Sequence, residues 1–191
     1  IVIAVTTFLL LFLLTGSLVL PIKALVMNVI SLSAVFGALV AIFQWGWFGG
    51  LDTTVTGAII ANMPVLMFCI AFGLSMDYEV FLLSRIKEFW DHSETKDHAA
   101  NDEAVAMGIT RTGRVVTAAA LLMAIVFAAI GFAGVSFMKM FGVGMMIAVL
   151  LDATLIRMLL VPAFMRVAGV WNWWAPAPMK RLYDRVGLRE S

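Results

Sequence analysis

The composition of this 191-residue chain is that of a membrane protein and not of a water-soluble domain. Hydrophobic residues make up 63% of the sequence and charged residues only 13%, whereas soluble domains carry about 45–50% apolar and about 25% charged residues. A net charge of +1 excludes the strongly basic surface of a nucleic-acid-binding protein. The single cysteine, Cys69, excludes an internal disulfide.

Five apolar stretches are long enough to cross a membrane as helices. A span needs about 20 mostly apolar residues, because its backbone polar groups must all be satisfied within the helix. The sequence therefore predicts an all-α bundle of five transmembrane helices, with the first two joined at Pro21 by a hairpin with almost no loop. The predicted spans are residues 1–20, 24–43, 61–84, 115–133 and 140–165.

These spans divide the chain into four predicted segments. Residues 1–84 contain the first three helices, and residues 115–166 contain the last two. Residues 85–114 form a cytoplasmic loop, in which the capping and acidic side chains of residues 101–107 predict a short surface helix. Residues 167–191 form a basic cytoplasmic tail. The chain starts at Ile1 and not at Met, so we expect it to be a piece of a longer protein.

The distribution of basic residues predicts the orientation in the plasma membrane. Short cytoplasmic loops carry the excess of Lys and Arg, and the opposite side, residues 44–57 and 134–139, holds only Lys139. The N-terminus is therefore predicted outside and the C-terminus in the cytoplasm. The predicted cytoplasmic basic residues are Lys23, Arg85, Lys87, Lys96, Arg111, Arg114, Arg166, Lys180, Arg181, Arg185 and Arg189. Interfacial aromatic belts are predicted from Trp45 and Trp47 on one side and from Trp171, Trp173 and Trp174 on the other.

Four charged residues lie inside the predicted spans: Asp77, Glu79, Asp152 and Arg157. Each costs about 2.5–3.5 kcal/mol at bilayer depth, and such residues usually mark a proton, ion or substrate path. Asp77 and Glu79 are about 200° apart on a helix, so they cannot share a face. We expect Glu79 and Arg157, at similar depth, to form a structural ion pair, which leaves Asp77 and Asp152 as candidates for proton transfer.

Tyr78 follows Asp77 directly, and its phenol needs a hydrogen-bond partner in a dry bundle. Removal from water favours the neutral, protonated form of a carboxylic acid. A group that carries protons across a membrane must be able to adopt this form. A purely structural role in joining helices is the alternative, and for Asp152 both readings stay open. His92 and His98 show no metal-ligand pattern, and we expect solvated loop residues there.

Small residues predict close helix packing in the last two spans. Gly131, Gly134, Gly142 and Gly144, together with several alanines, would let helices approach one another. Gly142 and Gly144 lie inside a span with no basic residue following, so they do not indicate a phosphate-binding loop.

Four motifs give the chain a specific resemblance. Residues 73–85 read GLSMDYEVFLLSR, residues 19–23 VLPIK, residues 112–120 TGRVVTAAA and residues 151–157 LDATLIR. Together with the tail at residues 172–178 they resemble the MMPL family of the RND transporter superfamily. The resemblance implies that the five spans are the eighth to twelfth of a twelve-helix transporter, preceded by a large extracytoplasmic domain.

The resemblance also implies a function. Such transporters use Asp-Tyr pairs, one in each half, as a proton relay that drives export of lipids or other hydrophobic compounds. Asp77 and Tyr78 match the second pair, while Asp152 and Arg157 match a charged pattern in the last helix. Expected partners are membrane lipids, a lipidic substrate, the missing N-terminal half with its own Asp-Tyr pair, and a second copy in a homo-oligomer. We expect no enzyme activity, no metal and no cofactor, with protons as the coupling ion.

Two other classes remain open from sequence. An intramembrane aspartyl protease also needs two carboxylates on neighbouring helices. The sequence before Asp152 is Val-Leu-Leu, however, and not the Gly-x-Gly that precedes the aspartate in the motif of such proteases. A sterol-sensing-type regulatory bundle would share the transporter fold without pumping, and its function would be insensitive to Asp77.

Overall fold

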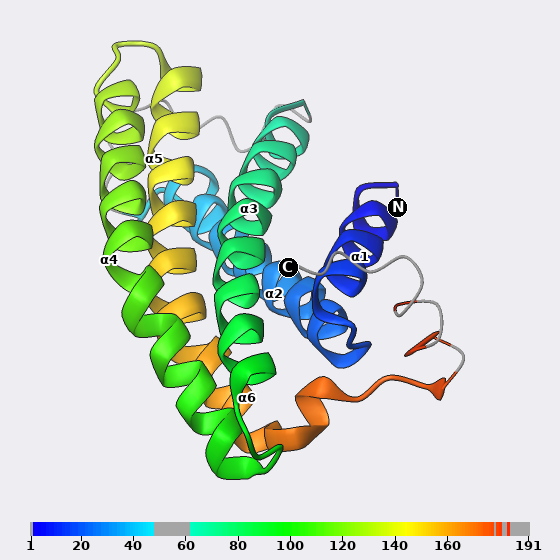
Figure 1. Cartoon of the computed structure of the whole chain (residues 1–191). Coiled ribbons are helices and arrows are strands. Elements are labelled where there is room, and N and C mark those ends of the chain that lie inside the picture. Colours follow the sequence, from blue (N-terminus) through cyan, green and yellow to red (C-terminus); the bar gives the residue numbers. More distant parts are fainter. Residues whose placement is uncertain (1, 48–61, 178, 181–182, 184–191) are drawn as a thin grey trace. The chain divides into compact units, whose positions relative to one another are not determined.

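Every element in the described part of the chain is helical, as predicted. The computed structural model describes residues 2–47, 62–177, 179–180 and 183 (Figure 1). The α-helices are α1 (Val2–Thr15), α2 (Val19–Leu39), α3 (Asn62–His92), α4 (His98–Gly131), α5 (Ser136–Leu151) and α6 (Val161–Ala168). Two π-helical segments, η1 (Val40–Gln44) and η3 (Asp152–Leu160), continue α2 and α5, and a 3-10 segment, η4 (Gly169–Trp173), follows α6.

Four of the five predicted spans are helices long and apolar enough to cross a membrane. They are Val19–Gln44, Met63–His92, His98–Gly131 and Ser136–Trp173. Helix α1, at 14 residues, is apolar but shorter than the 20 residues predicted for the first span. The expected all-α membrane bundle is therefore confirmed, and residues 48–57 of the segment predicted to lie outside are not among the described residues.

The turn between α1 and α2 lies five residues before the predicted position. Gly16 adopts a φ of 65°, a conformation that glycine takes at little cost, and α1 ends there. Ser17 Oγ accepts a hydrogen bond from the Val19 N–H at 3.1 Å and so caps α2. Pro21 is in the first turn of α2, where its missing N–H costs nothing. The prediction that Pro21 forms the hairpin is therefore wrong, and Lys23 lies within the helix.

The predicted surface helix at residues 101–107 is part of a single long helix, α4, that begins at His98. The cap is Asp97, whose Oδ1 accepts a hydrogen bond from the Ala100 N–H at 2.8 Å. Asn101 is fully buried, and its Nδ2 donates to the Met165 carbonyl at 3.0 Å. The helix starts earlier than predicted because the Asp97 carboxylate satisfies an otherwise unpaired backbone donor of the first turn.

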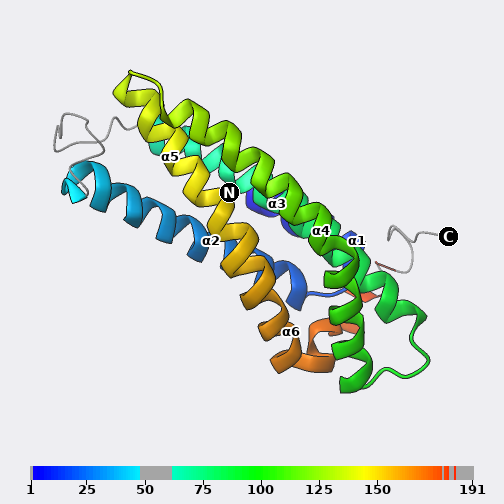
Figure 2. The same cartoon turned by 90° about the vertical axis from the view of Figure 1, so that its left-hand side faces the viewer.

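The chain divides into two compact units. Unit 1 consists of Ile1–Met27, Met76–Arg114 and Arg157–Ser191, and unit 2 of Asn28–Ser75 and Val115–Ile156. Helices α2, α3 and α4 contribute residues to both units. Within unit 2, α5 runs beside α4, as both views show (Figures 1 and 2).

Close packing of small residues is confirmed for three of the four glycines named from sequence. A Cβ added to Gly142 would lie 2.8 Å from the Cα of Gly131, and one added to Gly144 would lie 2.9 Å from a methyl group of Leu39. Nothing lies within 4 Å of a Cβ added to Gly134. The close approach of α4 and α5 therefore depends on the Gly131–Gly142 contact.

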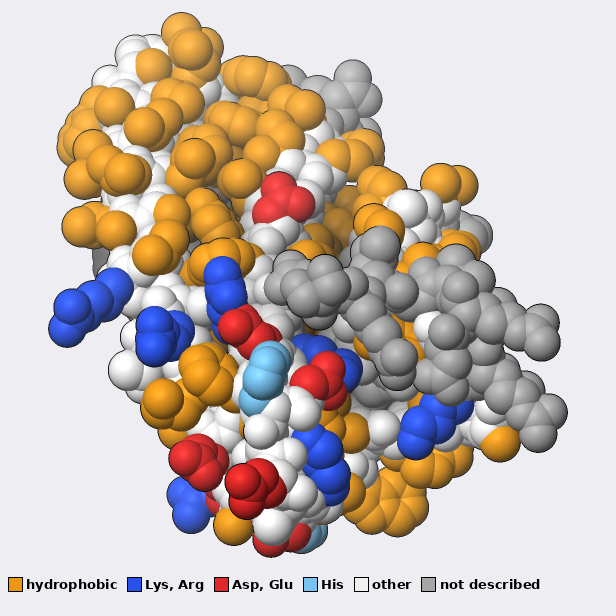
Figure 3. Space-filling view, in the orientation of Figure 1, with side chains coloured by type: hydrophobic (Ala, Val, Ile, Leu, Met, Phe, Trp, Pro, Cys, Tyr) orange, Lys and Arg blue, Asp and Glu red, His pale blue; other side chains and the backbone are white. Residues whose placement is uncertain are grey.

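Helix α4 presents an apolar face outward within unit 2. Leu121, Leu122, Ile125 and Val126 are each more than half exposed, and hydrophobic side chains cover this part of the surface over α4 and α5 (Figure 3). Soluble monomers rarely expose contiguous apolar patches of this kind. A hydrocarbon environment, in which backbone groups are satisfied within helices, accommodates such a face.

We expect Gly142→Ala to destabilise the protein, because the added methyl would lie 2.5 Å from the Phe127 carbonyl oxygen on α4. Overpacking of this kind costs about 1–3 kcal/mol, and it should lower the thermal unfolding temperature measured in detergent. Gly37→Ala is the matched control, since nothing lies within 4 Å of its Cβ in α2. Equal melting temperatures of the two variants would contradict the Gly131–Gly142 contact.

Candidate functional site

Helix α3 presents two carboxylates in opposite directions. Glu79 is 3% exposed, whereas Asp77 is exposed, as the angle of about 200° between them requires. Asp77 was expected to be buried in the bundle, and the structure differs on this point. Within the described part of the chain, Asp77 has no hydrogen-bond or ion-pair partner.

Unit 1 buries three charged side chains from three elements. Lys23 of α2, Glu79 of α3 and Arg157 of η3 are each no more than 3% exposed. The charges of Glu79 and Arg157 both act on the Lys23 ammonium group. Buried charges are tolerated only when other charges or polar groups compensate them. The Glu79–Arg157 ion pair stays a prediction, and Lys23 joins these residues as a second buried cation.

The Glu79 carboxylate acts on the Lys23 ammonium group electrostatically, without a direct hydrogen bond to Lys23 Nζ among the described residues. Among the described residues, neither Lys23 Nζ nor Glu79 Oε1 has a hydrogen-bond partner, although both atoms are buried. Lys23 Nζ lies 5.9 Å from the centroid of the Phe164 ring. Sequence reasoning missed Lys23 because it assigned this residue to a turn. Counting the helix from Ser17 as its cap would have placed Lys23 inside a span.

Tyr78 contacts Arg157 through its ring. The guanidinium carbon of Arg157 lies 5.4 Å from the ring centroid, within the range of a cation–π interaction. The partner expected for Tyr78 was a carboxylate on another helix, and in the described residues its hydroxyl group makes no hydrogen bond. The structure thus brings a residue of the predicted proton relay together with Arg157.

Asp152 is held by a serine in unit 2. Its side chain is buried, and its Oδ1 accepts a hydrogen bond from Ser75 Oγ at 2.8 Å. Ser75 precedes Glu79 by four residues, which places both on the inward face of α3. This spacing could have identified Ser75 from sequence once Glu79 was known to face inward.

Asp152 and Arg157 both belong to the π-helical segment η3. A π-helix repeats its hydrogen bonds at i→i+5, and single π turns often occur at functional sites. Residues five apart in an α-helix point about 140° apart, so the π-helical backbone changes the direction of Arg157 relative to a regular helix. Sequence reasoning gave no indication of this segment.

The two histidines lie near the helix ends. His92 Nδ1 is 2.8 Å from the Glu88 carbonyl, and the ring of His98 packs against Gly169, which has a φ of 52°. Across residues 2–47, 62–177, 179–180 and 183, no group of three or more His, Cys, Asp or Glu side chains could hold a metal ion.

Comparison with known proteins identifies the class. The sequence profile of the MMPL family matches residues 1–189, and the chain belongs to this family, as the four motifs predicted. It is a multi-pass membrane protein. The relatives lend no support to the protease and sterol-sensing alternatives.

Three curated relatives cover nearly the whole chain. A membrane protein of Streptomyces coelicolor is 45% identical over 96% of this chain and 26% of its own length. The mycolic acid-containing lipids exporter MmpL11 of Mycolicibacterium smegmatis is 38% identical over 98% of this chain and 19% of its own length. The trehalose monomycolate exporter MmpL3 of the same organism is 42% identical over 100% of this chain and 18% of its own length. The chain thus spans about a fifth to a quarter of these relatives.

We expect Glu79→Gln to destabilise unit 1, because Lys23 and Arg157 stay buried while the carboxylate that acts on Lys23 is removed. Removing one member of a buried ion pair costs about 3–5 kcal/mol, which should lower the melting temperature and the yield of folded protein. Two double variants, Glu79→Gln/Lys23→Met and Glu79→Gln/Arg157→Met, identify the partner. The one that restores more stability removes the cation that Glu79 compensates, and failure of both would exclude Glu79 as a structural counter-ion.

Proposed function

We propose that this chain is the C-terminal transmembrane part of an exporter that uses the proton gradient to move lipids or other hydrophobic compounds. Two of the relatives described above are named as exporters of mycolic acid-containing lipids and of trehalose monomycolate. Because the chain spans about a fifth to a quarter of their length, the transport cycle requires the remainder of the protein.

The observation that carries this proposal is the exposed position of Asp77 within the apolar segment Met63–His92. A carboxylate at bilayer depth faces a protein interior or an aqueous cavity and not the lipid. In this proposal the missing N-terminal half of the transporter, with its own Asp-Tyr pair, covers Asp77 and Tyr78. Both side chains have polar groups available for that contact, since neither makes a hydrogen bond within the described residues.

The relay in this proposal consists of Asp77 and Tyr78. Asp77 takes up a proton from the outside, becomes neutral, and releases it toward the cytoplasm, while the Tyr78 hydroxyl group passes the proton. A change of charge at Asp77 shifts the balance between two conformations because the two differ in their affinity for the proton. Protons are the coupling ion in this proposal. Asp152 has a structural role, because its hydrogen bond with Ser75 joins α3 to η3.

The orientation belongs to the same proposal. The N-terminal end of the chain lies outside the plasma membrane, and the connection between α3 and α4 lies in the cytoplasm together with the C-terminal tail. Arg85, Lys87 and Lys96 near this connection give it the positive charge of a cytoplasmic side. Three other basic residues used for this prediction, Arg181, Arg185 and Arg189, lie outside the described residues. Assembly into a homo-oligomer is also a proposal.

We expect Asp77→Asn in the intact protein to abolish proton-coupled transport. Reconstituted in liposomes with an imposed proton gradient and trehalose monomycolate as the probe, the variant should lose about 100-fold or more of its proton flux, the scale on which removal of a proton-transfer group acts. Glu88→Gln is the control, because Glu88 is an exposed carboxylate on the same helix. Proton flux of Asp77→Asn equal to that of Glu88→Gln would show that Asp77 carries no proton.

Two substitutions at Tyr78 separate its hydroxyl group from its ring. Tyr78→Phe keeps an aromatic face for Arg157 and removes the proton-carrying group, so we expect slower proton flux with an unchanged melting temperature. Tyr78→Leu removes both, so it should also lower the melting temperature by the loss of a cation–π interaction of about 1–2 kcal/mol. Full transport by Tyr78→Phe would restrict Tyr78 to a structural role.

A further inference from the structure

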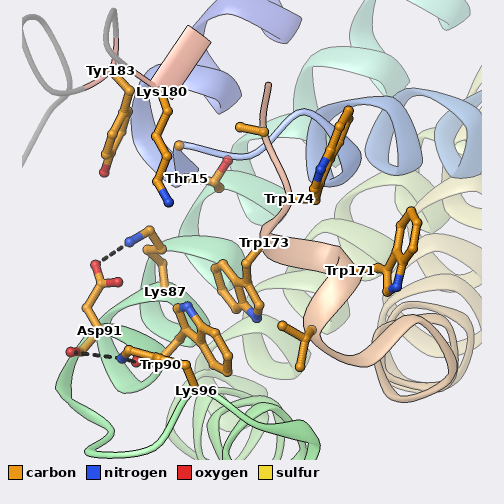
Figure 4. A pocket seen from close by; sticks show the side chains of 13 residues that line it. Thr15, Lys87, Trp90, Asp91, Lys96, Trp171, Trp173, Trp174, Lys180 and Tyr183 are labelled. Carbon is orange, nitrogen blue, oxygen red and sulfur yellow. Dashed lines mark hydrogen bonds and ion pairs between the residues drawn. The ribbon is translucent and has the colours of Figure 1, made fainter. Parts of the chain in front are cut away.

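A pocket of about 580 Å³ lies within unit 1, apart from the candidate proton relay. Its walls come from the end of α1, the last turns of α3 and the segment that follows α6 (Figure 4). Three lysines and one aspartate, Lys87, Lys96, Lys180 and Asp91, line it, which leaves an excess of two positive charges. The other walls are largely aromatic, with Trp90, Trp171, Trp173 and Trp174 among the lining residues.

Two of the lysines are held in place by a stacked pair of tryptophans. The rings of Trp90 and Trp173 lie 4.9 Å apart and are inclined by only 4°. Lys96 Nζ lies 5.0 Å from the centroid of the Trp90 ring, and Lys87 Nζ lies 5.9 Å from that of Trp173. Trp173 Nε1 donates to Asn101 Oδ1 at 3.1 Å, which fixes the orientation of the ring. The stacked rings of Trp90 and Trp173 therefore form a rigid wall of the pocket.

The ammonium groups of the pocket are incompletely neutralised. Lys87 forms an ion pair with Asp91, and Lys96 Nζ donates to the backbone carbonyl groups of Asp91 and Ser93 at 3.3 and 3.0 Å. Neither carbonyl group carries a formal charge. Lys180 has no ion-pair partner in the part of the chain that the structure describes, and its side chain extends from the C-terminal segment toward that of Lys87 (Figure 4).

We propose that this pocket binds the headgroup of an anionic phospholipid that carries two phosphates, such as cardiolipin. Lysine ammonium groups bind phosphate as point charges, and two phosphate charges match the excess of two positive charges. The pocket lies where α1 and the spanning segment Met63–His92 end, so a lipid headgroup reaches it from the bilayer surface. Basic pockets between transmembrane helices bind such headgroups, and tryptophan favours the same interface.

A lipid bound here joins three parts of unit 1. It would link the end of α1, the last turns of α3 and the segment after α6, which are far apart in the sequence. This site goes beyond the proposed export function and does not depend on it, because no residue of the Asp77–Tyr78 relay lines the pocket. A bound lipid is therefore retained by an Asp77→Asn variant.

The experiment is native mass spectrometry of the intact protein titrated with cardiolipin, with neutral phosphatidylcholine as the reference lipid. The wild type should bind cardiolipin preferentially, and the Lys87→Gln/Lys180→Gln variant should bind it about 10-fold or more weakly, because each lysine near a lipid surface contributes to binding. Arg111→Gln/Arg114→Gln removes the same charge from exposed positions of α4 outside the pocket and should bind cardiolipin as the wild type does.

Three outcomes would overturn the proposal. Equal weakening by both double variants would show charge attraction without a site, and equal binding of cardiolipin and phosphatidylcholine would show no headgroup recognition. Binding of pyrophosphate without binding of cardiolipin would show a site for a soluble anion. The melting temperature without lipid checks that the lysine variant folds, and Lys180→Gln alone, on the segment after α6, provides a second variant if it does not.

Discussion

The inward position of Glu79 determines how the charges around α3 are arranged. A carboxylate in the interior of a membrane bundle needs cations or hydrogen-bond donors near it, and unit 1 places Lys23 and Arg157 inside as well. Helix geometry then fixes the neighbours of Glu79. Ser75, four residues earlier, shares the inward face, whereas Asp77, two residues earlier, points outward. The inward face of α3 thus carries Glu79 and Ser75, and its outward face carries the residue proposed to bind protons.

Much of the fold could be predicted because the bilayer limits what a chain can do. The requirement for about 20 apolar residues in each span identified four of the spanning helices. Small residues predicted close helix packing, which the structure shows where Gly142 of α5 meets Gly131 of α4. The opposite directions of Asp77 and Glu79 followed from helix geometry alone. What the periodicity could not supply was which of the two faces inward, since that depends on the cations contributed by other helices.

The wrong predictions around Pro21 arose because proline is found in more than one structural setting. Proline both ends helices and occupies their first turn, and Pro21 does the second because Ser17 already caps α2 and Gly16 makes the turn. Reading Pro21 as a helix end places Lys23 in a turn, whereas in the structure it is buried within α2. The contact of Ser75 with Asp152 joins residues 77 apart in the sequence, and η3 follows α5 as a π-helix where the sequence predicts a regular helix. The spacing from Glu79 indicates that Ser75 faces inward, but no local pattern indicates that its partner is Asp152 or that η3 is π-helical.

Tyr78 links the proposed relay to the fixed charges of unit 1. It is adjacent to Asp77 in the chain, and the face of its ring lies against Arg157 of η3. Coupling between a titrating group and a distant element needs a contiguous set of packed side chains with two arrangements. If protonation of Asp77 moves Tyr78, the attraction between the ring and Arg157 changes with it. In the proposed mechanism the energy of proton binding then reaches η3 through the Tyr78 ring, while the buried Glu79 and Lys23 are proposed to keep the surrounding helices in place. The proposed division of roles would account for the presence of both an exposed and a buried carboxylate in one short motif.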